Sequence, residues 1–309
     1  MTTIARKNKK KVKYSKWGYI FIAPFFVIYL IFSFFPLVST FYNSFFENYR
    51  VGLTQVGPTF VGLKNFETLF SNADLLQYLG NTAIMWVWGF VPQIVIALAL
   101  ALLFTNMRLK IKNQQFFKTV IYMPNLIMAS AFAMLFFALF SDGGPVNQIL
   151  MSAGIIAEPF RFLTKVGASR GLVALMNFLM WFGNTTILLM AGILGIDQSL
   201  FESAEIDGAS ATQIFKSIIL PLLMPILIYV VITSMIGGIQ MFDVPQILTN
   251  GGGSPNRSTM TLIMFLNKHL TSKNYGLAGA TSVIVFAITA VLSITVYRML
   301  QNKSKSVSK

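Results

Sequence analysis

Six long stretches without a single acidic or basic side chain constrain this chain more than any other feature of its sequence. They comprise residues 17–46, 75–107, 119–141, 171–196, 217–242 and 274–297. Each can supply the roughly 20 apolar residues with which a helix crosses the hydrocarbon core of a bilayer. Inside a bilayer the backbone must satisfy its own hydrogen bonds, so apolar stretches of this length indicate helices. The sequence therefore predicts an all-α membrane protein with six transmembrane helices.

The predicted spans can be placed to within a few residues. They lie at about 18–40, 80–105, 118–140, 171–194, 217–240 and 279–300. The rest is a basic N-terminal tail (1–17), a short C-terminal tail (301–309) and connecting segments that are too short to bury a sizeable core. Charged residues make up only 11% of the chain, against about a quarter in a soluble domain, so no soluble domain is expected.

The distribution of basic residues indicates the orientation of the spans. If the N-terminus is cytoplasmic, 16 of the 24 Lys and Arg residues fall on the cytoplasmic side and 8 on the outer side. This bias follows the positive-inside rule and predicts that both termini are cytoplasmic. A binding surface for nucleic acid would not explain why the basic residues are concentrated on one side of the membrane. Nucleic acid is therefore not an expected partner, despite the net charge of +14.

The segment between the fourth and fifth spans, about residues 195–216, does not have the composition of an ordinary cytoplasmic loop. It contains four of the ten acidic residues of the chain beside a single lysine, namely Asp197, Glu202, Glu205 and Asp207. A solvated acidic loop would explain the composition alone. The order of its capping residues points instead to a shaped protrusion that docks into a partner.

Two capping boxes and one glycine predict this shape. Ser199 with Glu202, and Ser210 with Gln213, have the spacing with which a hydroxyl residue and a Glu or Gln close the first turn of a helix. Gly208 stands between the two boxes, where a left-handed residue ends a helix at low cost. The pattern therefore predicts two short helices separated by a sharp turn at Gly208.

The same segment resembles the EAA loop of binding-protein-dependent ABC importer permeases. The pattern of that family is E-A-A-x-x-x-G, nine residues, then I-x-L-P. This chain has Glu202-Ser203-Ala204-x-x-x-Gly208, nine residues, then Ile218-x-Leu220-Pro221, with one small residue, Ser203, in place of the first Ala. Further resemblance to the maltose-type and glycerol-phosphate-type permeases lies in Asp207-Gly208-Ala209, Phe215, Ala23-Pro24, Phe242-Asp243, Thr249-x-Gly251-Gly252 and Tyr275-Gly276.

The resemblance implies a type I ABC importer permease of the bacterial inner membrane, acting as a subunit of an ATP-driven sugar importer. It implies that the chain forms half of a translocation path and that the first short helix of the 195–216 segment couples to an ATPase. The implied partners are a second, different EAA-loop permease, two cytoplasmic ABC ATPase subunits, an extracytoplasmic sugar-binding protein and membrane lipid. No cofactor is expected on this chain, because the partner ATPase uses the ATP. The implied coupling residues are Ser199, Glu202, Ser203, Ala204, Glu205, Asp207, Gly208, Ala209, Phe215, Leu220 and Pro221.

Polar residues inside the predicted spans are candidates for the substrate path, because polar groups at membrane depth are costly unless they have partners. A sugar is neutral and rich in hydroxyl groups, so amide side chains beside aromatic faces would suit it. The preferred cluster is Trp181, Asn184 and Thr185 in the fourth span, with Asn125 and Gln240 as further candidates. Hydrogen bonding between helices is the alternative role for each of these residues.

An ion-coupled secondary transporter or a channel is the competing class. Such carriers commonly relay ions through carboxylates or histidines inside the membrane, whereas no predicted span interior of this chain carries Asp, Glu, Lys, Arg or His. Sodium coupling through backbone carbonyls stays open. An enzyme is not predicted, because no acid–base pair or ligand cluster converges at one depth. The phosphate-binding string G-x-x-x-x-G-K-[ST] does not occur, so any ATP hydrolysis must come from a partner.

Overall fold

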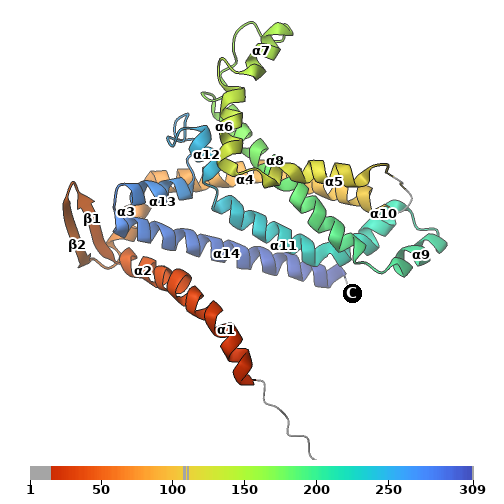
Figure 1. Ribbon diagram of the computed structural model, residues 1–309, viewed down its shortest axis with the longest axis horizontal. Helices are drawn as coiled ribbons and strands as arrows, with labels where there is room; N and C mark the ends of the chain where they lie inside the picture. Colours follow the sequence, from red (N-terminus) through yellow and green to blue (C-terminus); the bar gives the residue numbers. More distant parts are fainter. Residues whose placement is uncertain (1–14, 107–108, 110, 308–309) are drawn as a thin grey trace, which may run out of the picture.

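The computed structural model describes residues 15–106, 109 and 111–307, and folds them mainly into long apolar helices (Figure 1). Within the described residues six helical segments are long and apolar enough to cross a membrane, which confirms the predicted number of spans. They are Lys16–Ser44, Ala73–Thr105, Ala129–Ser152, Val166–Leu194, Ala211–Leu248 and Tyr275–Asn302. Most of the predicted tail 1–17 lies outside the described residues.

The first span leads into a small β-hairpin. It consists of α1 (Ser15–Tyr29), the π-helical turn η1 (Leu30–Phe34) and α2 (Phe35–Ser44). β1 (Phe46–Val51) then pairs antiparallel with β2 (Thr54–Phe60). The short helix α3 (Lys64–Phe70) follows the hairpin, which the sequence analysis did not predict.

A buried amide fixes the base of this hairpin. The Nδ2 of Asn65 on α3 donates hydrogen bonds to the carbonyl oxygens of Ser44 and Phe46, each at 3.0 Å. Because these contacts join α3 to the end of α2, they are set by tertiary packing and not by a local strand pattern.

Two long helices form the centre of the bundle and pack against each other over much of their length. They are α4 (Ala73–Thr105) and α8 (Val166–Leu194). Ala97 and Ala101 on α4 are fully buried and pack in one apolar cluster with Leu189 and Ile193 of α8. Small residues at such a contact let two membrane helices approach closely.

The predicted third span, 118–140, is not one continuous helix. α5 (Gln114–Tyr122) passes into the 3₁₀ turn η2 (Met123–Leu126), and α6 (Ala129–Phe140) begins only after a break. The α-helix passes into the 3₁₀ turn at Pro124, which lacks the N–H needed for the helical ladder. The backbone then becomes extended at Ile127 and Met128, which separates η2 from α6. α6 and the following α7 (Pro145–Ser152) project away from the long helices in Figure 1.

The remaining helices complete the bundle. They are α9 (Gln198–Ile206), α10 (Ala211–Ile214), the π-helical turn η3 (Phe215–Ile219), α11 (Leu220–Ile239), α12 (Asp243–Leu248), α13 (Leu262–Thr271) and α14 (Tyr275–Val307). α14 packs along α11 and continues through most of the predicted C-terminal tail. α9 and α10 lie at one end of the bundle, called the α9 end below, and β1 and β2 lie at the opposite end, called the hairpin end (Figure 1).

Candidate functional site

The 195–221 segment at the α9 end contains the two short helices and the sharp turn that its sequence predicts. α9 ends at Ile206, Asp207 is its C-cap residue, and Gly208 follows with φ of 74°. The N–H of Gly208 donates to the carbonyl of Glu205 at 3.1 Å, and that of Ala209 donates to the carbonyl of Ala204 at 2.9 Å. This pair of bonds is a Schellman motif, in which the left-handed residue is usually glycine because a Cβ there is strained.

The beginning of α9 differs from the prediction. Asp197 caps the helix, since its carboxylate accepts the backbone N–H of Ser199 at 2.9 Å, and this bond lowers the pKa of Asp197. The predicted capping box of Ser199 and Glu202 is therefore wrong, because an acidic residue two positions earlier already satisfies the free N–H. Glu202 instead accepts a bond from the Nε2 of Gln198 at 2.9 Å.

The second predicted capping box is confirmed. Ser210 precedes α10, its hydroxyl accepts the N–H of Gln213, and the Gln213 side chain accepts the N–H of Ser210 at 2.7 Å. α10 then runs through η3, which contains Phe215, into α11 at Leu220-Pro221 without leaving the helix. The 195–221 segment is thus joined to the fifth span by continuous helical backbone.

One face of α9 is apolar and exposed. Leu200 and Ile206 have 44% and 86% of their surface exposed, and the small residue Ser203 lies between them at i, i+3, i+6 spacing. We call these three residues the α9 outer face. On the other side Phe201 borders a cavity of about 490 Å³ between α9 and the bundle, together with Phe215. Leu200 and Ile206 were not among the predicted coupling residues, although their spacing was visible in the sequence.

A second cavity, of about 280 Å³, lies among α4, α8 and α11, and we call it the polar cavity. Aromatic rings, amides and hydroxyl groups dominate its lining, and none of the described residues that form it carries a charge. The lining residues are Trp86, Phe90, Gln93, Asn177, Trp181, Asn184, Thr185, Leu188, Tyr229, Val230, Thr233, Ser234, Gly237, Gly238 and Met241.

The structure brings together three of the five residues predicted for the substrate path. Trp181, Asn184 and Thr185 all line the polar cavity. Asn125 does not border it, and its Nδ2 donates to the carbonyl of Met180 at 3.0 Å, which is the alternative interhelical role. Gln240 lies exposed at the C-terminal end of α11, outside the lining.

A buried hydrogen bond joins the two central helices at this cavity. The Nε2 of Gln93 on α4 donates to the hydroxyl oxygen of Thr185 on α8 at 2.8 Å, and both side chains are at most 6% exposed. Gln93 was not among the predicted site residues. Its partner lies 92 positions away, so only the packing of α4 on α8 reveals the pair.

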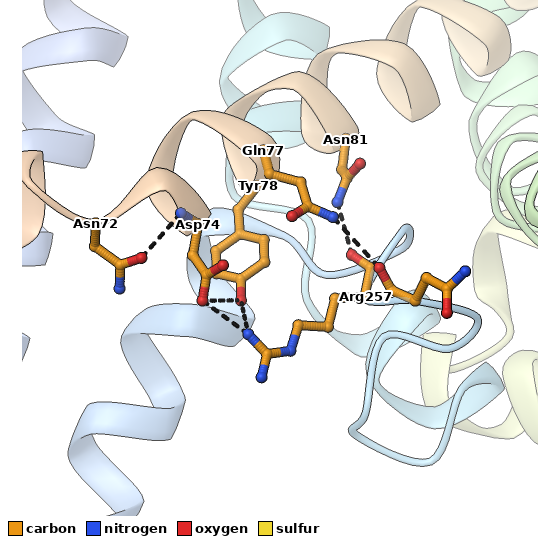
Figure 2. A network of polar contacts seen from close by, with 7 residues as sticks. Asn72, Asp74, Gln77, Tyr78, Asn81 and Arg257 are labelled. Atoms are coloured by element: carbon orange, nitrogen blue, oxygen red, sulfur yellow. Dashed lines mark hydrogen bonds and ion pairs between the residues drawn. The ribbon is translucent and has the colours of Figure 1, made fainter.

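At the hairpin end, a polar network holds the loop 249–261 against α4 (Figure 2). The amide of Asn81 donates to the carbonyls of Arg257 and Met260 at 2.8 and 3.1 Å. Its own oxygen accepts a bond of 2.6 Å from the guanidinium of Arg170 on α8, which also donates to the carbonyl of Ser258 at 2.9 Å. These contacts attach the loop to both central helices.

Comparison with known proteins identifies relatives over nearly the whole chain. Residues 93–308 match the family model described as binding-protein-dependent transport system inner membrane component. The lactose transport system permease protein LacF of Rhizobium radiobacter is 31% identical over 95% of this chain and 96% of its own length. The multiple sugar-binding transport system permease protein MsmF of Streptococcus mutans is 30% identical over 92% and 95% of the two chains.

The fold also matches a solved structure. A chain of a bacterial alginate ABC transporter, determined in complex with an alginate pentasaccharide-bound periplasmic protein, superimposes with a TM-score of 0.77. The match covers 96% of this chain and 98% of that one at 21% sequence identity. The overall fold is thus shared with an experimentally determined chain.

Proposed function

Because the chain belongs to the binding-protein-dependent transport system inner membrane components, we propose that it is the permease subunit of an ATP-driven importer of neutral saccharides. This family consists of multi-pass membrane permeases and not of enzymes, so the chain moves a solute and catalyses no reaction. Relatives named for lactose, arabinooligosaccharides and multiple sugars support a saccharide as the solute. The family assignment leaves the ion-coupled carrier without support.

The polar cavity is the observation that carries the proposed substrate path. Its amides and hydroxyl groups can exchange hydrogen bonds with sugar hydroxyls, and its aromatic rings offer apolar faces to the C–H faces of sugar rings. Trp181 and Tyr229, which border it, are 48% and 58% exposed. Lipid would leave the neighbouring amides without partners, which is costly at membrane depth. We infer that a second permease subunit covers this side and that each subunit contributes half of the path.

The α9 outer face is the proposed contact with the ATPase. It presents two exposed apolar side chains on a helix of nine residues, and a capped start and a glycine turn hold that helix in place. A rigid helix that displays apolar anchors beside a small residue suits insertion into a groove of another protein. ATP is bound by that partner and not by this chain. The coupling roles of Glu202, Ser203, Ala204 and Asp207 are part of the same proposal.

The orientation follows from the charges. From the excess of Lys and Arg on the α9 side we infer that this end is cytoplasmic, together with the C-terminal end of α14. The hairpin end then faces outward, and there the extracytoplasmic sugar-binding protein would deliver the solute. The family description supports a bacterial inner membrane as the location.

Co-purification tests this function directly. The chain is extracted from its native membrane in mild detergent after cross-linking, and the proteins that accompany it are identified by mass spectrometry. The proposal predicts an ATPase with a phosphate-binding loop and a second permease with an EAA-type segment. A Gly208→Val variant, extracted in parallel, should enter the membrane normally and lose the ATPase. Recovery of the wild-type chain alone would contradict the proposal.

A further inference from the structure

Trp86 on α4 is held in one orientation at the polar cavity by three contacts. Its indole Nε1 donates to the hydroxyl of Ser234 on α11 at 3.2 Å. Its ring stacks on Phe90 one turn away, with centroids 5.4 Å apart and planes inclined by 17°. Its edge lies directly over Gly238, where an added Cβ would fall inside the van der Waals volume of the indole.

Gly238 is the reason that the indole can lie there. Its backbone approaches the indole of Trp86 more closely than any residue with a Cβ would allow, so the ring fills the space that a side chain on α11 would otherwise take. A hydrogen bond on one side and a stacked ring on another then restrict rotation of the Trp86 side chain. The indole is therefore a fixed part of the wall and not a mobile side chain.

This fixed ring stands at the end of the cavity nearer the hairpin end. α4 starts at the hairpin end, and Trp86 precedes Gln93 on it by seven residues, which is about 10 Å along the axis. Gly238 and Asn177 line the same end of the cavity from α11 and α8. Under the proposed topology a solute arriving from outside passes the Trp86 indole before it reaches Gln93, Thr185 and Asn184.

We propose that Trp86 is a specificity-determining residue for transport, because its fixed indole sets the width of the cavity where the saccharide enters. Ser234 and Gly238 act as positioning residues, which hold the ring in place. The saccharide class that fits is a linear, unbranched chain, whose sugar rings pass the indole one after another. A branched saccharide presents a wider cross-section at the same point. This inference rests on the proposed function of the chain as a saccharide permease.

The test compares uptake of linear and branched neutral saccharides by the full transporter in proteoliposomes. Trp86→Ala removes the wall and should raise the ratio of branched to linear uptake by about tenfold, the scale on which one methylene group in a pocket changes selectivity. Gly238→Ala pushes the indole into the cavity and should lower the same ratio. Ser234→Ala, which frees the ring, should shift the ratio in the direction of Trp86→Ala but by less. Trp88→Phe is the matched control, because Trp88 is 51% exposed on the same helix and does not line the cavity.

Opposite shifts in the two variants separate a role in specificity from a role in folding, because a folding defect lowers uptake of both saccharides together. Equal losses for both saccharides in Trp86→Ala and Gly238→Ala, or an unchanged ratio in both, would overturn the inference. In those cases normal uptake by the wild-type transporter would leave the proposed function standing. No saccharide uptake by the wild-type transporter, with its ATPase and binding protein present, would refute the proposed function itself.

Discussion

The carboxylate of Asp74 and the guanidinium of Arg257 lie 2.8 Å apart, although the two residues are 183 positions apart in the chain. The hydroxyl of Tyr78 donates to the same carboxylate at 3.1 Å (Figure 2). The ion pair is solvent-exposed, with 52% of the Arg257 side chain and 33% of the Asp74 side chain accessible. Exposed pairs of this kind contribute only about 0.2–1 kcal/mol. The buried amide of Asn81, and not the ion pair, should therefore hold the loop 249–261.

We expect Asn81→Ala to release this loop. The substitution removes two donors from the carbonyls of Arg257 and Met260 and the acceptor of Arg170, and each unsatisfied buried group costs about 1–3 kcal/mol. Hydrogen exchange of the loop amides, measured by mass spectrometry, should accelerate strongly. Asp74→Asn, which removes only the exposed ion pair, serves as the control and should change exchange little. A larger effect of Asp74→Asn than of Asn81→Ala would contradict this ranking.

Gly208→Ala should uncouple ATP hydrolysis from transport. A Cβ at this position meets no neighbouring atom, so the cost arises only from φ of 74°, which is worth about 1–2 kcal/mol for a non-glycine residue. The strain should shift the angle between α9 and α10 and lower ATPase activity stimulated by the binding protein. Gly195→Ala is the matched control in the same segment, because a Cβ there makes only ordinary contacts at 3.5 Å. Equal activities in the two variants would exclude a role for the left-handed turn.

Ile206→Glu should weaken association with the ATPase at least about tenfold, which corresponds to 1.4 kcal/mol. Ile206 is 86% exposed, so the substitution should leave the fold intact while it places a charge on the α9 outer face. Affinity can be measured with the purified ATPase and the permease in nanodiscs. Leu53→Glu provides the control, since Leu53 is fully exposed in the turn between β1 and β2. Unchanged affinity of the Ile206→Glu variant would remove the α9 outer face from the proposed interface.

Trp181→Ala should raise the KM for saccharide uptake about tenfold, because it removes an aromatic face from the polar cavity. Loss of binding common to the ground state and the transition state raises KM and leaves kcat unchanged. Asn125→Ala is the comparison, since the amide of Asn125 bonds to the backbone of Met180 and does not border the cavity. It should affect stability and leave KM unchanged. A raised KM in Asn125→Ala together with an unchanged KM in Trp181→Ala would assign the substrate path to Asn125.

The stability of α13 should fall as the pH is lowered. Burial, and to a smaller extent the charge of Lys268, lowers the pKa of His269, whose Nε2 has no hydrogen-bond partner among the described residues. A lowered pKa means that folding favours the neutral histidine. Its contribution to the free energy of unfolding is therefore fully present above about pH 6.5, which is its pKa in the unfolded state, and is lost as the pH falls through the folded pKa. Hydrogen exchange across α13 at pH 5.5 and 7.5, corrected for intrinsic rates, measures the effect. His269→Phe, which keeps a ring against Phe265, should abolish the pH dependence.

Local patterns in the sequence were sufficient for the number of spans and for the turn at the α9 end. Six uncharged stretches predict six helices, because a membrane helix satisfies its hydrogen bonds within its own segment. Gly208 and the capping box of Ser210 depend on residues at most a few positions away, so they could be recognised without the fold. The start of α9 was misplaced because two local caps competed, and Asp197 prevailed over Ser199.

Tertiary structure alone decided which side chains meet. Trp86 reaches Ser234 across 148 positions, and Gln93 reaches Thr185 across 92. Asn125 and Gln240 were further candidates from sequence beside the preferred Asn184, but of these three only Asn184 borders the polar cavity. The reason is physical: lipid is as apolar as leucine, so hydrophobic patterning does not fix the rotation of one membrane helix against the next. Close packing at small residues such as Ala97, Ala101 and Gly238 sets that rotation, and it becomes visible only when the helices are assembled.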